Sequence, residues 1–509
     1  MISKVYSFGL LGLEAYLTEI ECDVTRGLPS VSIVGLADPA VKESKDRVRS
    51  AIKNSGFQYP PDRITINLAP ADIPKIGPSF DLPIALGILT ATEQIPSLSL
   101  KDYVILGELS LDGRIRPIKG VLPIAISLKE KGTKKIILPI ENAKEAAVVR
   151  EIEVYPVRNL REVTNFLNTP ESISPFKVDL QELFKKASNY SIDFSEVKGQ
   201  FLVKRAIEVA VSGNHNILLI GPPGSGKTML AKRIPTIMPD LSLEEALETT
   251  RIHSVMGFIP KDSGLVATRP FRSPHHTISD VALIGGGQLP QPGEISLAHN
   301  GVLFLDELPE FHRNVLEALR QPLEEGRVRI GRSKGSLEFP SRFMLVCAMN
   351  PCPCGYYTDP RRKCHCSSTK IQNYLSKVSG PLLDRIDIHI EVLSLKYREL
   401  SSEQEQEPSS KIKERIDRTH QIQRERFKDE KIFFNSQMNP KQIKRFCNLN
   451  KEAKDLLEMA ISELGFSARA YDKILKVSRT IADLENSDSI LTEHISEATQ
   501  YRSLDRQLW

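Results

Sequence analysis

Residues 217–228 read Ile-Leu-Leu-Ile-Gly-Pro-Pro-Gly-Ser-Gly-Lys-Thr, an apolar run that passes directly into a glycine-rich turn. The run is typical of a short buried strand, and a helix is expected to start near Met229. Glycines in such a turn let backbone N–H groups converge on phosphate oxygens, and the following helix terminus adds a favourable dipole. The turn fits G-x-x-x-x-G-K-[ST] between a strand and a helix, which is the context this motif requires. It consists of Gly221, Pro222, Pro223, Gly224, Ser225, Gly226, Lys227 and Thr228. We therefore predict an ATP site in which Lys227 reaches the β- and γ-phosphates and Thr228 ligates magnesium.

A second apolar strand, predicted over 302–305, ends in two acids. Its carboxyl end would place Asp306 and Glu307 at the edge of an open α/β sheet where ligands bind. We expect Asp306 to hold magnesium, directly or through water. Glu307 is expected to polarise the attacking water, since phosphoryl transfer depends chiefly on positioning and charge stabilisation. A third strand is predicted over 343–348. These elements predict an ATP-hydrolysing domain built on a parallel sheet.

The rest of the chain predicts further domains, because 509 residues exceed what one core usually organises. Strands predicted over 31–36, 63–68 and 135–139, with a helix over 45–54, indicate an α/β domain at the N-terminus. Helical periodicity dominates towards the C-terminus, as over 451–464 and 468–484. The predicted division is an N-terminal α/β domain over 1–168, a linker over 169–195, the ATPase core over 196–395 and a helical lid over 396–509.

Composition indicates the class of protein and its compartment, and says little about its activity. Hydrophobic residues make up 40% and charged residues 26% of the chain, which is ordinary for a globular protein. The net charge of +4 neither favours nor excludes a nucleic-acid partner. We find no signal peptide and no apolar run of about 18 residues that would span a membrane, so the cytoplasm is expected.

Four of the seven cysteines fall within fifteen residues, as the pairs Cys352-Pro-Cys354 and Cys364-His-Cys366. Such a cluster in a reducing compartment suggests metal binding rather than disulfides. Four thiolates can surround zinc tetrahedrally and leave no open position, so a structural site is expected. His365 could compete as a ligand, and reduced thiols without metal are the alternative.

Two further stretches could contact a substrate or a neighbouring subunit. Residues 325–340 alternate like a β-hairpin, with Arg332 and Lys334 at a glycine-bracketed tip. These two side chains would suit contacts with DNA phosphates, and a solvated basic hairpin is the alternative. Residues 269–279 contain the adjacent His275 and His276, for which a structural or subunit-contact role is favoured over metal binding.

These motifs, with Ala348–Asn350 and Pro381–Asp387, resemble those of AAA+ ATPases of the magnesium-chelatase group. The run over 269–277 and the run over 348–355 are similar to those of the ComM/YifB family in particular. The resemblance implies that Asn350 senses the γ-phosphate and that Arg385 acts in trans as an arginine finger. It also implies that Arg469, in Ser467-Ala-Arg-Ala470, contacts nucleotide in cis. A finger supplied in trans implies a ring, expected to be a homohexamer whose assembly depends on nucleotide.

The resemblance also implies a biological role, with alternatives. Members of this family act as branch-migration helicases on single-stranded or branched DNA in homologous recombination and natural transformation. The alternative is a magnesium-chelatase-type ATPase that remodels a protein or inserts a metal. The N-terminal domain resembles the proteolytic domain of Lon, which places Ser79 at the nucleophile. In the matching stretch 117–124, however, both positions expected for the partner lysine are apolar, so no protease activity is expected.

Overall fold

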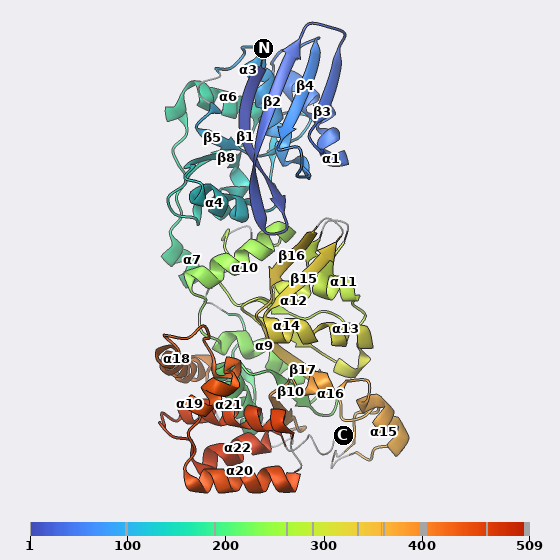
Figure 1. Ribbon diagram of the computed structural model, residues 1–509, viewed down its shortest axis with the longest axis vertical. Helices are drawn as coiled ribbons and strands as arrows, with labels where there is room; N and C mark the ends of the chain where they lie inside the picture. Colours follow the sequence, from blue (N-terminus) through green and yellow to red (C-terminus); the bar gives the residue numbers. More distant parts are fainter. Residues whose placement is uncertain are drawn as a thin grey trace. The chain divides into compact units, whose positions relative to one another are not determined.

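The computed structural model describes residues 2–96, 100–187, 190–260, 263–287, 290–332, 335–357, 359, 362–395, 405–464 and 467–502. By packing, the chain forms two compact units (Figure 1). The N-terminal unit comprises Met1–Lys186 together with Ser242–Ala267, and the second unit comprises Ala187–Leu241 together with Thr268–Trp509. The four-part division stays a prediction. The assignment of 242–267 to the N-terminal unit is a feature that the sequence did not indicate.

The N-terminal unit is built on a mixed seven-stranded sheet in the order β3-β4-β2-β1-β5-β8-β9. Alternation determines which face of a strand is buried: in β4, Ile64, Ile66 and Leu68 face the core. Helix α3 is buried along its whole length and is apolar on all sides apart from Asp81 and Thr90. The strands are β1 (Ile2–Leu11), β2 (Glu14–Thr25), β3 (Ser30–Val34), β4 (Arg63–Ala69), β5 (Tyr103–Ile105), β8 (Lys135–Pro139) and β9 (Glu153–Val157). The main helices are α2 (Ser44–Asn54), α3 (Asp81–Ala91), α4 (Val121–Glu130), α5 (Ala143–Ala147) and α6 (Leu160–Asn168).

Helix α10 (Leu243–Met256) joins this unit although it follows the glycine-rich turn in sequence. It begins with a capping box between Ser242 and Glu245 and ends at Gly257, which adopts a left-handed conformation. Near its end, the Ser254 hydroxyl donates to the buried Glu145 carboxylate. The backbone N–H of Gly120 donates to the Ser254 carbonyl at 3.0 Å. The chain therefore leaves the ATPase core after α9 (Lys227–Ile237), packs into the N-terminal unit and returns.

The second unit contains a five-stranded sheet in the order β11-β14-β17-β10-β18, with every neighbouring pair parallel. The three central strands are buried at every position because the sheet is covered on both faces. The strands are β10 (Ile217–Ile220), β11 (Phe271–Arg272), β14 (Val302–Leu305), β17 (Met344–Met349) and β18 (Ile388–Glu391). All three strands predicted here are present, with the third displaced by one residue.

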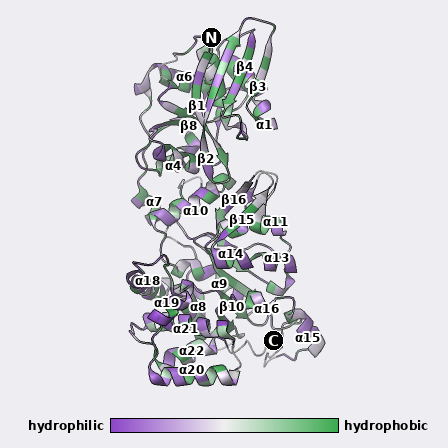
Figure 2. Ribbon diagram, in the orientation of Figure 1, coloured by the Kyte–Doolittle hydropathy of each residue, from purple (hydrophilic) through white to green (hydrophobic). Residues whose placement is uncertain are grey.

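Helices complete the second unit. The main helices that precede β10 or lie between the strands are α8 (Phe201–Gly213), α9, α13 (Arg313–Ala318), α14 (Arg320–Glu325), α15 (Ser368–Leu375) and α16 (Gly380–Leu383). The C-terminal helices are α18 (Ser409–Arg426), α19 (Pro440–Phe446), α20 (Lys451–Leu464), α21 (Ala468–Leu484) and α22 (Thr492–Gln500). Their ribbons mix polar and apolar residues, as amphipathic helices do (Figure 2). The predicted fold class, a mixed α/β protein with a parallel P-loop sheet and a helical C-terminal region, is confirmed.

The predicted hairpin is present as β15 (Arg327–Arg332) paired antiparallel with β16 (Gly335–Pro340). Val328 and Ile330 are buried, whereas Arg327 and Arg329 on the alternate face are about half exposed. A second insert, α11 (Asp280–Ile284) with β12 (Gly285–Gly286) and β13 (Gln291–Pro292), lies beside it. A Cβ at Gly285 would lie 3.0 Å from Ile330 Cδ1, so the two inserts are in close contact. Among the described residues, no helix is both long and apolar enough to cross a membrane.

Replacing Ser254 by alanine should weaken the attachment of α10. The change removes a donor from the buried Glu145, which should lower the local unfolding free energy by about 1–3 kcal/mol. Hydrogen exchange over α4 should become faster. The control is Ser462→Ala, which removes an exposed hydroxyl that donates to the Met459 carbonyl on α20. Equal exchange in both variants would show that the Ser254–Glu145 bond does not hold α10 in place.

Candidate functional site

The glycine-rich turn connects β10 to α9 and encloses a buried lysine. Lys227 is only 8% exposed, and its Nζ donates to the carbonyls of Gly221 at 2.7 Å and Pro222 at 2.9 Å. A third contact, at 3.2 Å, joins Lys227 Nζ to Asn350 Oδ1. Burial lowers the pKa of Lys227, and the charges of Asp306 and Glu307 oppose that shift. The predicted γ-phosphate sensor and the predicted phosphate-binding lysine thus lie in direct contact.

The conformation of the turn suits an anion. Gly224 and Gly226 have φ values of 76° and 93°, which side chains rarely adopt. A Cβ at Gly221 would lie 2.1 Å from the Val392 carbonyl oxygen, so this position accepts no side chain. Ser225 Oγ is buried and makes no hydrogen bond within the described part of the chain. A hydroxyl without a partner, beside the start of a helix, fits a phosphate oxygen as its missing acceptor.

The acidic pair follows β14, as predicted. Thr228 Oγ1 donates to Asp306 Oδ2 at 2.6 Å, which brings together two oxygen groups of the kind that magnesium prefers. Together they would hold magnesium, which supplies charge neutralisation on the phosphates when bound. Glu307 adopts a left-handed conformation with φ of 54° and is exposed. Its carboxylate is therefore accessible to water, as the role of polarising an attacking water requires.

His276 lies beside Glu307, with its Nδ1 3.4 Å from Glu307 Oε2. Its ring also packs against His275, with the two ring centroids 4.1 Å apart. This proximity arises because β11 pairs in parallel with β14, so both strands end at the same edge of the sheet. Sequence reasoning favoured a structural or subunit-contact role for these histidines and missed the contact with Glu307. Only the pairing of two strands about thirty residues apart reveals it.

Two arginines with predicted nucleotide roles instead contact carboxylates of this chain. Arg385 follows α16, where its guanidinium contacts Glu324 and the Pro381 carbonyl. Arg469, in the first turn of α21, lies 3.4 Å from Asp384 Oδ2 through its Nη1. Their roles as trans finger and cis sensor stay predictions.

The four cysteines of the cluster converge. The Sγ atoms of Cys352, Cys354 and Cys364 lie 3.3–3.6 Å apart in pairs, and all four Sγ atoms lie within 4.8 Å of one another. Cys352 is buried, and the other three, including Cys366, are partly buried. Backbone N–H groups of Tyr356 and His365 lower the pKa of the Cys354 thiol to about 6. The geometry therefore fits a tetrahedral metal with thiolate ligands.

The other predicted sites are only partly described. Arg332 ends β15, but its side chain and the whole of Lys334 lie outside the described residues. Ser79 lies in a 3-10 turn over Pro78–Phe80. Leu122 and Ile124, at the positions where a Lon-type lysine is expected, are buried on α4. The nearby Lys75 is also buried, and its ammonium donates to the carbonyls of Pro70 and Ile73.

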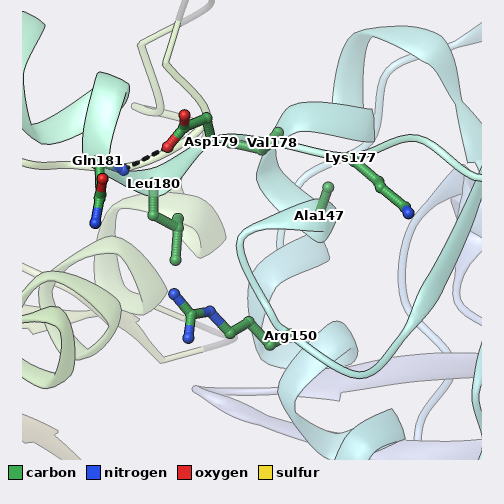
Figure 3. A pocket seen from close by; sticks show the side chains of 7 residues that line it. All are labelled: Ala147, Arg150, Lys177, Val178, Asp179, Leu180 and Gln181. Carbon is green, nitrogen blue, oxygen red and sulfur yellow. Dashed lines mark hydrogen bonds between the residues drawn. The ribbon is translucent and has the colours of Figure 1, made fainter.

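A surface hollow in the N-terminal unit is poorly suited to binding an anion (Figure 3). Arg150 points towards Leu180 across it, and Lys177 lies at one side (Figure 3). Its polar side chains are exposed, and the Asp179 carboxylate already accepts from the Gln181 N–H at the start of α7 (Leu180–Ala187) at 2.9 Å. An anion would meet a carboxylate at that helix start, so this hollow does not suit a phosphate.

Comparison with known proteins agrees with this geometry. Three family models match: magnesium chelatase, subunit ChlI over 193–400, subunit ChlI of Mg-chelatase over 20–142, and the C-terminal region of magnesium chelatase subunit ChlI over 406–502. Competence protein ComM of Haemophilus influenzae is 44% identical over 514 residues, which span 100% of this chain and 98% of that protein. The chain belongs to the ComM/YifB family.

The remaining similarities agree with this membership. The uncharacterized protein YifB of Escherichia coli is 42% identical over 508 residues, covering 100% of this chain and 98% of that one. Lon protease 2 of Bacillus subtilis is 30% identical over 187 residues, about a third of each chain (33%). The chain is thus a magnesium-chelatase-like AAA+ ATPase with a Lon-protease-like N-terminal domain. Membership of the ComM/YifB family implies ATP and magnesium, which the Lys227, Thr228 and Asp306 arrangement fits.

Glu307→Gln should separate nucleotide binding from hydrolysis. The amide keeps the size of the side chain but cannot act as a base, so ATP hydrolysis should fall by about 10²–10⁴-fold. Binding of a fluorescent ATP analogue should change little, because Lys227 and the turn are untouched. Lys227→Ala is the contrasting variant and should lose binding itself. Normal hydrolysis by Glu307→Gln would remove Glu307 from the reaction.

Proposed function

We propose that this chain is a ring-forming motor that uses ATP hydrolysis to move along single-stranded or branched DNA, driving branch migration in homologous recombination and natural transformation. The observation that carries the proposal is the basic hairpin built onto the ATPase core. Arg327 and Arg329 are 49% and 48% exposed, and within the described part of the hairpin both pair with the same acid, Glu338. This face of β15 therefore keeps excess positive charge that suits a phosphate backbone. A full-length relative that is named a competence protein supports a role in natural transformation.

The hydrolytic site in this proposal is shared between subunits. Arg385 Nε is buried and makes no hydrogen bond within the described ranges, although the rest of the guanidinium contacts Glu324. Transfer of this arginine to a neighbour's nucleotide would complete the charge stabilisation that phosphoryl transfer needs. Such a head-to-tail contact closes into a ring, and we propose a homohexamer that assembles with nucleotide.

A second candidate function is a protein-remodelling or metal-insertion ATPase of the magnesium-chelatase type. It is favoured by the family models, which are named for a magnesium chelatase subunit. The Lon-protease-like N-terminal domain argues against it. A partner protein, rather than DNA, would then stimulate hydrolysis.

We further propose that Cys352, Cys354, Cys364 and Cys366 hold structural zinc, in a cytoplasmic setting where thiols stay reduced. The convergence of four Sγ atoms supports this assignment. Zinc would fix the segment between Asn350 and α15. Its role there is to order the chain that leads from the γ-phosphate sensor to the Arg385 loop.

Branched DNA should stimulate ATP hydrolysis, and ATP should drive strand displacement on a three-strand junction. Replacing Arg332 and Lys334 together by alanine should remove about two phosphate contacts, which lowers the salt dependence of DNA binding by about 2 in log–log slope. Glu452→Ala/Lys454→Ala on α20 is the control. Stimulation by a partner protein and by no form of DNA would favour the chelatase-type function instead.

Purified protein should contain about one zinc ion per chain, measured by elemental analysis. Cys354→Ser/Cys364→Ser should lose the metal and lower thermal stability, because two of four ligands are gone. Cys447→Ser, which changes a buried cysteine outside the cluster, should retain it. Full activity and stability with no bound metal would leave the cluster as reduced thiols.

A further inference from the structure

Helix α21 contacts the Arg385 segment through two ion pairs, one helical turn apart. Lys473 Nζ lies 2.9 Å from Asp387 Oδ1, and Arg469 Nη1 lies 3.4 Å from Asp384 Oδ2. Residues 469 and 473 share one face of the helix because they are four positions apart. The two acids lie on either side of Arg385 in the sequence. Helix α21 therefore contacts the segment 384–387 both before and after the predicted finger.

The Lys473–Asp387 pair is the more buried of the two contacts. Both side chains are largely buried, at 14% and 13% exposure. His215 Nδ1 lies 3.5 Å from the other Asp387 oxygen, which also accepts from the Asn216 N–H at 3.1 Å. Although burial alone would raise the pKa of Asp387, the Lys473 ammonium and the His215 ring hold that pKa well below its usual range. A buried carboxylate with these partners keeps its charge and its position.

The connection continues to the finger itself. Asn216 Nδ2 donates to the Arg385 carbonyl at 2.9 Å, and the Asp387 N–H donates to the Asn216 carbonyl at 3.0 Å. Asn216 directly precedes β10, the strand that carries the glycine-rich turn. The backbone of Arg385 is thereby fixed to both α21 and the P-loop strand, while its side chain contacts Glu324.

The Arg469–Asp384 pair has the opposite character. Arg469 is 67% exposed and Asp384 is 39% exposed, so the pair is weak and exchanges readily. A phosphate, with more charge and more acceptor oxygens, competes well with one exposed carboxylate for a guanidinium. Arg469 can therefore leave Asp384 while Lys473 still holds Asp387.

We infer that Lys473 is a positioning residue for Arg385, and that Asp384 is the resting partner which Arg469 leaves when nucleotide binds to the same subunit. This inference rests on the proposed shared site. The helical C-terminal region of one subunit would then position the Arg385 that acts on the nucleotide of the next subunit. Replacing Lys473 would therefore slow hydrolysis at the neighbour's site. Among the described residues, the contact made by the Lys473 ammonium is with Asp387 and not with a predicted nucleotide ligand. A purely structural role for Lys473 would weaken the site of its own subunit, whereas a positioning role weakens the site of the neighbour.

Mixing experiments with inactive full-length variants distinguish these roles. Glu307→Gln lacks the base of its own site but keeps its finger, whereas Arg385→Ala lacks the finger and keeps the base. Equal, random mixing of these two should restore hydrolysis to about a quarter of the wild-type rate. A site is active only where a subunit that keeps its base lies beside a neighbour that keeps its finger, and each condition holds for half of the subunits. Lys473→Met should reduce the maximal rate at least tenfold with little change in the KM for ATP. It should be rescued by mixing with Glu307→Gln and not by mixing with Arg385→Ala.

Three further variants separate positioning by Lys473 from a general loss of packing and test the resting contact of Arg469. Lys476→Met is the control: this lysine, near Lys473 on α21, donates to the Ser436 carbonyl and reaches Asp387 only through its charge, so most of the rate should remain. Lys473→Arg keeps the charge and should retain most of the rate, which separates positioning from misfolding. Asp384→Asn should lower the Kd for an ATP analogue by about threefold, because Arg469 loses its competing partner.

The outcomes distinguish a failure of the shared site from a failure of the positioning role of Lys473. Failure of Glu307→Gln and Arg385→Ala to complement would reject the shared site, and the inference with it. If that pair complements but Lys473→Met is rescued by Arg385→Ala, the shared site stands and the positioning role is wrong. Unchanged nucleotide affinity in Asp384→Asn would overturn the resting contact.

Discussion

The buried ammonium of Lys227 is the interaction on which the rest of the ATPase site depends. A buried charge requires acceptors, and here they are the carbonyls of Gly221 and Pro222 and the amide oxygen of Asn350. These acceptors come from the ends of two adjacent parallel strands, β10 and β17. The hydrogen bonds that satisfy Lys227 therefore also fix the position of Asn350, the predicted γ-phosphate sensor. Because β14 pairs with β17, it also places Asp306 and Glu307 at the same edge.

The same electrostatic requirement explains the arrangement of the arginines. The three cations with a predicted role at the nucleotide each have a stand-in oxygen: main-chain carbonyls for Lys227, Glu324 for Arg385 and Asp384 for Arg469. ATP would replace these partners with phosphate oxygens. In our account, ATP binding therefore exchanges the present oxygen partners of these cations for phosphate oxygens. This exchange moves α21 and the segment that carries Arg385, and that movement in turn displaces the hairpin β15–β16.

The sequence was sufficient where function depends on local order along the chain. The strand, turn and helix over 217–237, the acids after 305 and the hairpin over 327–340 follow from composition and periodicity, and all are present. It was insufficient where contacts depend on folding. The attachment of α10 through Ser254, the His276–Glu307 contact and the Lys473–Asp387 pair each join segments far apart in sequence. Each residue is unremarkable in its own segment, because a serine, a histidine or a lysine on a helix or loop carries no signal of its distant partner.

The most direct test of the shared site is the position of Arg385 in an assembled ring. A structure of the full-length ring with ADP, magnesium and a fluoride mimic of the transferred phosphate would locate this side chain. Our account predicts that Arg385 leaves Glu324 and contacts the phosphate mimic held by Lys227 of the adjacent subunit. An Arg385 that still contacts Glu324 of its own chain, in a ring with all sites filled, would contradict it.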